Sequence, residues 1–386
     1  MKITHIHIER FRGFQNEDFE VGSLLTAIAW QNGTQKSTLL GIITQTFTLK
    51  TEDSMRVEKP LCGGSYISAF KDKFRLSPTF DKPKGHEWTI SFDAGMDDFT
   101  VESIKRTGDP NVRFWKKGAR QEGNGYISVP TIYLSLKRLV PVAEEAKIIT
   151  DDTLLTQEEL NEFKQLHNKI LIAQTPISSA TTITSKNKQS IGVSTELYDW
   201  NQNSMGQDNL GKIILALFSF KRLHDKYPRQ YKGGILAIDE MDATMYPASQ
   251  VELLKVLRKY ASKLNLQILF TTHSMSLLKA MDDLVQEVTK KEKTANQAKI
   301  LYLKKVDDKI AIKQGVNFKG IQLDLNVVAE GNNRKKNRIT AYTEDKENIL
   351  FVKAILKSKA FVLDFVDVTL PCSTLMELVT KRVPAF

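Results

Sequence analysis

Three short polar clusters in this sequence carry side chains that could bind and cleave a phosphate group. The first lies at residues 30–38, where Lys36 and Ser37 stand directly before an apolar run with helical spacing. Backbone amides at the start of a helix point toward phosphate oxygens, and the helix dipole favours negative charge there. Lys36 would reach the β- and γ-phosphates of a nucleotide, and the Ser37 hydroxyl would bind Mg²⁺. The other candidate contacts in this loop are Asn32, Gly33, Thr34, Gln35 and Thr38.

This loop departs from the usual phosphate-binding pattern, G-x-x-x-x-G-K-[ST]. Trp30 and Gln35 occupy its two glycine positions, and Gly33 is the only glycine left inside the loop. Glycine serves there because the backbone approaches the phosphate closely and sometimes needs a positive φ. A glutamine before the lysine therefore narrows the loop or changes its path. Taken alone, an incidental Lys-Ser-Thr in a loop remains an alternative.

The second cluster consists of two carboxylates that follow an apolar run. Residues 234–238 have the composition of a buried strand and lead directly into Asp239 and Glu240. A carboxylate at a strand tip beside a phosphate site supplies a partner for Mg²⁺, directly or through water. Glu240 could then polarise an attacking water as a general base. The alternative is a strand that ends in an ordinary acidic turn.

The third cluster, Thr271-Thr272-His273-Ser274, follows the next apolar run at residues 266–270. Parallel strands end at the same edge of a sheet, so His273 and Glu240 should converge where open α/β sheets bind ligands. A single histidine is usually structural, but beside a carboxylate at a strand tip it favours contact with a γ-phosphate.

A further candidate, Ser204-Met205-Gly206-Gln207, precedes an amphipathic helix predicted over residues 209–226. A serine, a glycine and exposed amides at a helix start form a second anion site. This site cannot easily reach the first one within the same subunit, which suggests that Ser204, Gly206 and Gln207 serve a neighbouring copy. An ordinary capped helix start is the alternative.

The elements that must position these clusters follow from hydrophobic periodicity. Strands are predicted at residues 6–11, 24–29 and 129–136, and a helix at 37–47 that places Leu39, Leu40, Ile43 and Phe47 on one side. Short alternating stretches at 88–92, 99–101 and 112–115 predict an antiparallel meander. The parallel strands 234–238 and 266–270 are separated by a helix at 248–264, which implies a sheet covered on both faces.

Two stretches outside this pattern complete the predicted organisation. Residues 156–172 have helical spacing, with Thr156 as N-cap and Glu159 three residues later. The Ser/Thr/Lys-rich residues 177–194 show no periodicity, so we expect a mobile loop or insertion. Near the end, the charged residues 332–337 precede a strand predicted at 338–342 and a helix at 346–357.

Composition narrows the class of protein. The 386 residues are 41% hydrophobic and 26% charged, which excludes a disordered or fibrous chain. The net charge of +10 favours an acidic partner such as nucleic acid or nucleotide. Two distant cysteines exclude a disulfide framework and a cysteine-built zinc site. No signal peptide and no run of ~20 apolar residues occurs, so we expect a cytoplasmic protein without a membrane partner.

The order of these motifs resembles the ATP-binding-cassette heads of the SMC and RecF class. Phosphate loop, Ser-x-Gly-Gln, Ile-Asp-Glu and Thr-His-Ser occur in that order, and the opening Ile6-His7-Ile8-Glu9-Arg10-Phe11-Arg12-Gly13-Phe14 looks like the first strand and turn of that class. The resemblance implies a parallel sheet with helices on both faces plus an antiparallel β subdomain. It also implies ATP and Mg²⁺ as ligands, with Arg12 close to the nucleotide. By the same resemblance Ser204 and Gly206 form the signature motif, Asp239 and Glu240 the Walker B pair, and His273 the switch histidine.

Within this class, the chain is similar to the ATPases of bacterial anti-phage systems. The Asn-Gly-Thr-Gln-Lys-Ser loop, Lys137-Arg138-Leu139 and residues 238–247 carry the likeness to ATPase subunits of Septu and retron-associated Septu systems. The PARIS ATPase and the OLD-family nucleases are relatives. The likeness covers residues 1–325, which we divide into a phosphate-loop and meander lobe (1–140), an insertion (141–200) and a signature and Walker B lobe (201–325).

The C-terminal segment, residues 338–386, resembles part of a Toprim fold. The run Ile339-Thr340-Ala341-Tyr342-Thr343-Glu344-Asp345 looks like its opening strand and acidic turn, with Glu344 as a remnant of its metal site. Two-metal phosphodiester chemistry needs several convergent carboxylates, and no later Asp-x-Asp pair follows. We expect a degenerate or truncated Toprim fold that serves for docking, or a simple βα unit.

Basic residues between Lys105 and Arg120, with Phe114 and Trp115 among them, could contact nucleic-acid phosphate or form a solvated face. The leading hypothesis is an ATPase that dimerises around ATP, or forms a larger homo-oligomer, and regulates a partner nuclease of the HNH type in phage defence. DNA or retron RNA/DNA is a candidate further partner. The alternatives are a scaffold that binds ATP without hydrolysis and an OLD-like nuclease that acts on DNA.

Overall fold

The computed structural model describes residues 1–30, 35–67, 70–77, 79–93, 95–105, 112–119, 125–140, 147–151, 154–185, 189–331 and 339–380. The chain forms two compact units, Met1–Ile321 and Gln322–Phe386. Over the described ranges, no helix is both long and apolar enough to cross a bilayer.

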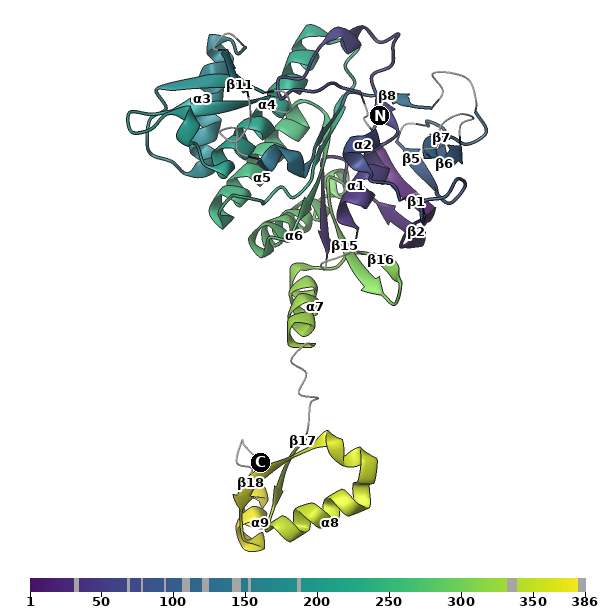
Figure 1. Ribbon diagram of the computed structural model, residues 1–386, viewed down its shortest axis with the longest axis vertical. Coiled ribbons are helices and arrows are strands. Elements are labelled where there is room, and N and C mark those ends of the chain that lie inside the picture. The colour runs from purple at the N-terminus through teal and green to yellow at the C-terminus, as the bar shows by residue number, and fades with distance from the viewer. Residues whose placement is uncertain are drawn as a thin grey trace. The chain divides into compact units, whose positions relative to one another are not determined.

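The centre of the first unit is a six-stranded sheet in the order β16-β15-β3-β14-β13-β9 (Figure 1). Its strands are β3 (Leu25–Trp30), β9 (Thr131–Leu134), β13 (Gly234–Ile238), β14 (Leu266–Thr272), β15 (Ala298–Val306) and β16 (Lys309–Gln314). All neighbours pair in parallel except β15 and β16. Every residue of β3, β13 and β14 is buried, which explains why these strands are continuous apolar runs.

Helices cover both faces of this sheet. The connections through α5 (Pro247–Lys263) and α6 (Met275–Thr289) step along the sheet in one direction, from β13 to β14 and on to β15. The chain leaves β3 through α1 (Lys36–Thr44) in the opposite direction, toward β9. Right-handed crossovers therefore place α1 on one face and α5 and α6 on the other. The arrangement confirms the predicted α/β class.

An antiparallel sheet in the order β2-β1-β5-β6-β7 packs on the α1 side. Its strands are β1 (Ile3–Phe11), β2 (Phe14–Glu20), β5 (Glu87–Phe92), β6 (Phe99–Lys105) and β7 (Val112–Lys116), which confirms the predicted meander. Phe11 joins an aromatic cluster inside it, with ring centroids 5.7 Å from Trp88 and 5.6 Å from Phe114. The core therefore runs from this sheet through α1 to the parallel sheet.

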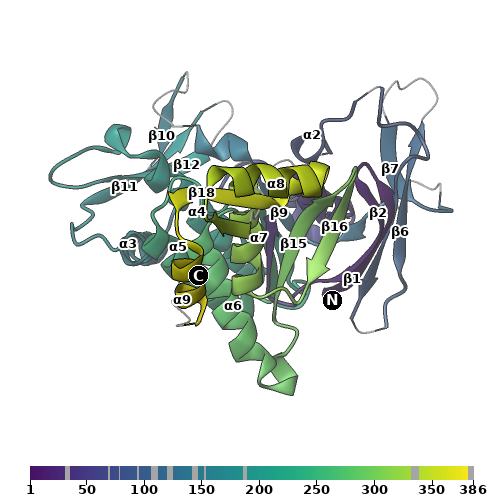
Figure 2. The same ribbon diagram turned by 90° about the horizontal axis from the view of Figure 1, so that it is seen from below.

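The described residues 147–151, 154–185 and 189–203 form a third layer, which contradicts the mobile loop predicted at 177–194. Helix α3 (Gln157–Leu171) starts with the expected capping box of Thr156 and Glu159. It is followed not by a loop but by strands β11 (Ser179–Thr184) and β12 (Gln189–Ser194), which pair with β10 (Ile149–Asp151). Ile183, Ile191 and Val193 are each only 1% exposed, so these buried side chains hold the strands in place. They are too few to produce a clear alternating pattern in the sequence. Figures 1 and 2 show this layer and β6–β7 at opposite ends of the unit.

Some boundaries also differ from the prediction. Helix α1 ends at Thr44, and Phe47 lies in a short strand, β4 (Phe47–Thr48), that pairs with β8 (Ile127–Ser128). The longest helix, α4 (Met205–Lys226), begins four residues earlier than expected. The remaining short elements of the first unit are η1 (Ser54–Val57), α2 (Phe70–Lys73), η2 (Leu136–Leu139), η4 (Trp200–Gln202) and η5 (Glu292–Thr294).

The second unit is built around two parallel strands. β17 (Ile339–Thr343) pairs with β18 (Leu363–Thr369), and α8 (Lys346–Leu356) and η6 (Lys357–Val362) connect them. Helix α9 (Cys372–Thr380) follows, and α7 (Phe318–Gly331) leads from the first unit into the second. Asp345 caps α8 by accepting a 2.7 Å hydrogen bond from the Asn348 amide. The predicted strand and helix are therefore present, and β18 and α9 complete a βαβα unit.

Candidate nucleotide-binding site

The end of the phosphate loop shows how glutamine replaces glycine. Gln35 lies before α1 in the left-handed conformation, with φ 55°. Its carbonyl accepts hydrogen bonds from the amides of Thr38, at 2.9 Å, and Leu39, at 3.2 Å. This backbone conformation is the one for which glycine is usually chosen, and it costs about 1–2 kcal/mol for a residue with a side chain. Asn32, Gly33 and Thr34 lie outside the described residues.

Lys36 is the hub of the site. Its ammonium donates hydrogen bonds to the Glu240 carboxylate and, over 3.0 Å, to Nε2 of His273. It also lies 4.2 Å from the centre of the Trp30 ring, within cation–π range. Glu240 and His273 follow β13 and β14, which are adjacent parallel strands. The structure thus brings together three residues that the sequence places far apart, at the carboxyl edge of the sheet.

Ser37 and Asp239 form the second contact between the phosphate loop and β13. The Ser37 hydroxyl donates to Oδ2 of Asp239 over 2.7 Å, and Thr271 Oγ1 donates to Oδ1, also over 2.7 Å. Thr271 belongs to the third polar cluster, but no role was predicted for its side chain. Its side chain fixes the carboxylate so that the other oxygen faces Ser37.

A hydroxyl and a carboxylate are the oxygen ligands that Mg²⁺ prefers, so Ser37 and Asp239 fit this ion. Among the described residues, no group of three or more His, Cys, Asp or Glu side chains could hold a metal ion alone. A magnesium ion at Ser37 and Asp239 would need phosphate oxygens and water to complete its shell, as is usual for nucleotide-bound Mg²⁺.

Glu240 occupies an unusual backbone position directly after β13. Its φ is 51°, and its amide donates a 2.6 Å hydrogen bond to Thr271 Oγ1. Its carbonyl accepts a 2.8 Å hydrogen bond from the Arg138 guanidinium. Both backbone groups are therefore held while the side chain turns toward Lys36.

His273 is held from both sides. Its ring meets Trp30 edge to face at 4.1 Å, and its amide donates over 3.3 Å to Asp242. Burial, and then the neighbouring Lys36 ammonium, lower the pKa of His273 below its usual value. An ammonium only donates, so Nε2 accepts from Lys36 and the ring is neutral at pH 7.

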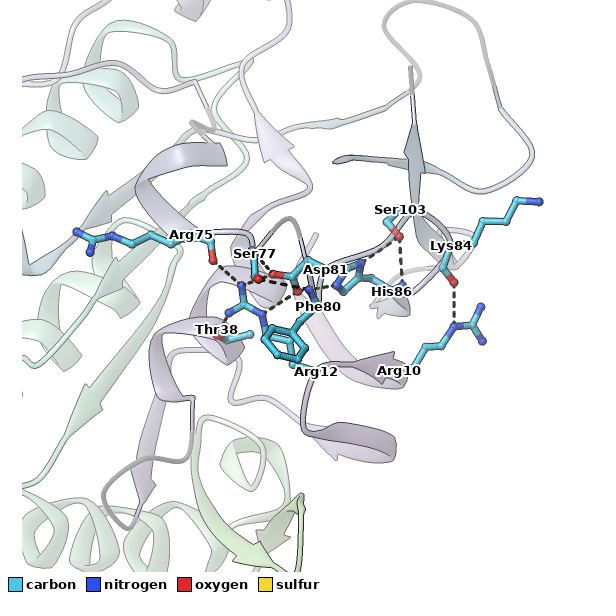
Figure 3. Close-up of polar contacts among 10 residues, drawn as sticks. All are labelled: Arg10, Arg12, Thr38, Arg75, Ser77, Phe80, Asp81, Lys84, His86 and Ser103. Atoms are coloured by element: carbon cyan, nitrogen blue, oxygen red, sulfur yellow. Dashed lines mark hydrogen bonds and ion pairs between the residues drawn. The ribbon is translucent and has the colours of Figure 1, made fainter. Parts of the chain in front are cut away.

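Arg12 contacts the helix of the phosphate loop (Figure 3). It lies in the turn between β1 and β2 with φ 52°. Its guanidinium donates over 3.1 Å to Thr38 Oγ1 and over 2.7 Å to the Arg75 carbonyl. Two further 3.0 Å bonds reach the two oxygens of Asp81. Arg12 is therefore anchored beside Thr38, one residue after Ser37.

Asp81 is the centre of a polar network that the sequence did not reveal. It also accepts from the Ser77 amide over 2.7 Å and contacts His86 Nε2 at 3.0 Å, while His86 Nδ1 lies 3.0 Å from the Ser103 hydroxyl (Figure 3). Burial alone would raise the pKa of Asp81, but the bonds from Arg12, Ser77 and His86 outweigh it and lower the pKa to about 2. This carboxylate stays ionised at any physiological pH.

Ser204, Gly206 and Gln207 form the start of α4 at a separate place. Ser204 Oγ accepts from the Gln207 amide over 3.3 Å, and Gln207 Oε1 accepts from the Ser204 amide over 2.8 Å. Within the described part of the chain, these residues make no hydrogen bond to Lys36, Ser37 or Glu240. The predicted N-cap of α4 is thus present, and an anion could still bind at the same helix end.

Two further predictions concern residues away from this site. Phe114 is 5% exposed and lies in the aromatic core, so it cannot stack on a nucleic-acid base as the basic stretch suggested. Arg106 and Arg120 of that stretch lie outside the described residues. In the second unit, Glu344 is exposed in the turn between β17 and α8.

One family model matches the middle of the chain. Residues 134–278 match the family model described as AAA ATPase domain. This segment contains Ser204, Asp239, Glu240 and His273, and the phosphate loop lies before it. No curated protein matches the chain.

Similar solved structures include an SMC head domain from Thermotoga maritima, at 13% identity and a TM-score of 0.44, which covers 82% of this chain and 100% of that one. An SMC head bound to the C-terminal winged-helix domain of ScpA has 13% identity, a TM-score of 0.48 and coverage of 83% and 100%. An SMC head with an extended coiled coil, bound to ScpA from Pyrococcus furiosus, has 12% identity, a TM-score of 0.45 and coverage of 85% and 99%. The family-model match alone makes residues 134–278 similar to an AAA ATPase domain.

Proposed function

We propose that this protein binds ATP with Mg²⁺ and hydrolyses it at the carboxyl edge of the parallel sheet. The observation that carries the proposal is the convergence of Lys36, Glu240 and His273 on one point, with the Ser37–Asp239 pair beside it. A lysine at a helix start, a hydroxyl–carboxylate pair and a second carboxylate are the parts that phosphoryl transfer requires.

The residues take distinct roles in this proposal. Lys36 and the amides at the start of α1 bind the phosphates, and Ser37 and Asp239 hold Mg²⁺. The ion, when bound with the nucleotide, would neutralise charge on the β- and γ-phosphate oxygens. Glu240 orients and polarises the attacking water, and neutral His273 accepts or donates a hydrogen bond near the γ-phosphate.

The ion pair of Lys36 and Glu240 suggests how nucleotide prepares the site. While Lys36 pairs with Glu240, Oε1 of that carboxylate is engaged by the ammonium rather than by an attacking water. A triphosphate offers Lys36 several negative oxygens, so it would draw the ammonium away from Glu240. Oε1 of the carboxylate that acts as base would thus be released to orient water when substrate is present.

We further propose that two copies enclose ATP and that this state regulates a partner nuclease in phage defence. The support is the motif order and the position of Ser204, whose helix start makes no hydrogen bond to Lys36 or Ser37 within the described part of the chain. An ATP held between Lys36 of one copy and Ser204 of another would link the arrangement of the two copies to nucleotide state. A partner that reads this arrangement would be controlled by ATP.

The test is ATP turnover by purified protein with Mg²⁺, compared with the Glu240→Gln and Lys36→Ala variants. Glu240→Gln should bind ATP and lose at least about 100-fold in kcat, because the general base is gone. Lys36→Ala should lose binding itself. No heat of binding for the wild type with ATP and Mg²⁺ in calorimetry would refute the proposal.

A scaffold that binds ATP without turnover is the second candidate. It is favoured by Trp30 and Gln35, which replace both conserved glycines of the loop pattern and put Gln35 in a strained conformation. If wild type and Glu240→Gln bind ATP equally but hydrolyse it at the same negligible rate, the scaffold is the correct function.

A further inference from the structure

Arg138 is a charged side chain in the interior of the first unit. It is only 2% exposed and lies in η2, directly after β9 at the edge of the parallel sheet. A buried guanidinium is costly unless its donors are satisfied, so its position needs a reason.

Its donors connect three separate parts of the chain. Nη2 donates over 2.8 Å to the Glu240 carbonyl, and Nε donates over 2.7 Å to Oδ1 of Asn209 in α4. Nη1 donates to the carbonyls of Leu134, over 3.3 Å, and Ser135, over 3.1 Å, which anchors the guanidinium to its own strand end. Arg138 thus bridges β9, the turn after β13 and the first helical turns of α4.

Asn209 continues the bridge to the other end of the same turn. Its side-chain amide donates over 2.9 Å to the Ala243 carbonyl. One turn earlier in α4, a methyl group placed on Gly206 would lie 2.5 Å from the Thr244 carbonyl oxygen. The residues from Glu240 to Thr244 are therefore clamped between Arg138 and the N-terminal part of α4.

This turn needs such a clamp because its backbone is strained. Glu240 and Thr244 both have positive φ, 51° and 68°, which side-chain-bearing residues rarely adopt. Such conformations persist only where the surroundings impose them.

Electrostatics also favour a cation at this place. Burial lowers the pKa of Arg138 to about 10, while Asp239, Glu240 and Asp242 oppose that effect. The guanidinium therefore remains charged at neutral pH. Its hydrogen bonds go to backbone carbonyls and to Asn209 rather than to the carboxylates of Asp239 and Glu240, which make their contacts with Lys36, Ser37 and Thr271 instead.

We propose that Arg138 is a positioning residue for Glu240, and that with Asn209 it couples the start of α4 to the backbone of the catalytic turn. The inference rests on the proposed ATPase function. Ser204 begins the helix that contains Asn209, so a phosphate bound at Ser204 would act on Glu240 through this bridge. The phosphate bound at Ser204 would belong to one ATP molecule, and Glu240 at the other end of the bridge would act on a different one.

The first experiment measures steady-state ATP hydrolysis and ATP binding by Arg138→Met, Arg138→Lys and Asn209→Leu. Misplacement of a catalytic group by about 1 Å can cost about 100-fold in rate, so we expect a fall in kcat of about 10- to 100-fold. The ATP dissociation constant should change by less than about twofold, because no phosphate contact is removed. Arg138→Lys should not rescue the rate, because an ammonium cannot span the same acceptors.

A matched control is Arg222→Met. Arg222 in α4 also bridges two elements, because it donates hydrogen bonds to Glu159 in α3. It lies near the other end of α4, away from the turn at residues 240–244. It should lower stability with kcat unchanged. Equal kcat for Arg138→Met and wild type, or an equal loss in Arg222→Met, would overturn the inference.

The second experiment does not depend on turnover and separates the two proposals. Hydrogen exchange in the nucleotide-free protein should show faster exchange for amides 239–244 in Arg138→Met, and no change there in Arg222→Met. If the wild type does not hydrolyse ATP, the proposed function fails, but hydrogen exchange still tests whether Arg138 holds the turn at residues 240–244. Unchanged exchange in that segment would refute the role of Arg138.

Discussion

At the scale of single residues, the site depends on side chains whose roles the sequence did not show. Trp30 stands where phosphate loops usually have glycine, which made the loop look degenerate. In the structure its ring contacts both Lys36 and His273 and is only 4% exposed. Trp30, which weakened the match to the phosphate-loop pattern, thus helps to hold Lys36 and His273 in place.

Trp30→Leu should therefore weaken ATP binding about three- to tenfold, and Trp30→Phe much less, because the cation–π attraction needs an aromatic face. That attraction uses no N–H group, so Lys36 would keep all its donors for phosphate oxygens. Calorimetry with ATP and Mg²⁺ measures the difference. Since both variants shrink the side chain, urea unfolding controls for packing, and equal affinities would contradict a specific role for the ring.

Asp81 gives a pH-dependent prediction. Its pKa of about 2 is below the ordinary value, so the carboxylate stabilises the fold above about pH 4 and loses that effect as pH falls toward 2. Asp81→Asn should cost about 2 kcal/mol at pH 7, because Arg12 loses a charged partner. The difference in free energy of unfolding between wild type and Asp81→Asn, measured with urea, should become smaller as the pH falls from 4 to 2.

The control for this prediction is Asp282→Asn on the exposed side of α6, which should change little at any of these pH values. A stability gap for Asp81→Asn that is independent of pH would show that the lost effect is not electrostatic.

At the scale of elements, the most predictive rule was that parallel strands end at the same edge. It placed Glu240 and His273 together from the sequence alone, because both follow uninterrupted apolar runs. The rule could not place Thr271 or Arg138, since their partners are set by three-dimensional packing and not by spacing along the chain. Strands β11 and β12 were missed for a related reason: threonine, serine and glycine outnumber the few buried Ile and Val residues that hold them.

The contact between α4 and the turn after β13 gives a prediction at this scale. Alanine at a glycine inside a helix usually stabilises by about 1 kcal/mol. At Gly206 the new methyl group would instead clash with the backbone of Thr244, so Gly206→Ala should destabilise the protein by about 1–3 kcal/mol. Thermal unfolding measures the sign directly. A raised midpoint would show that α4 can move away from this turn without cost.

At the scale of the whole molecule, the proposed site consists of two parts, the cluster around Lys36 and the helix start at Ser204. All contacts among Lys36, Ser37, Asp239, Glu240 and His273 lie within the first unit. Ser204 and Gln207 belong to the same unit, and among the described residues they make no direct hydrogen bond to these side chains. In the proposed dimer, a second copy would supply the helix start that faces the triphosphate.

This arrangement is tested by Ser204→Asp and Ser204→Asn in a Glu240→Gln background, where ATP should persist. Both substitutions keep a good N-cap, so the start of α4 should stay folded. Aspartate would bring a negative charge to the triphosphate of the other copy, whereas asparagine would not. Light scattering with ATP and Mg²⁺ should therefore show dimers for Ser204→Asn and monomers for Ser204→Asp, with ATP bound in both. Dimers of equal strength in the two variants would mean that Ser204 does not face nucleotide across an interface.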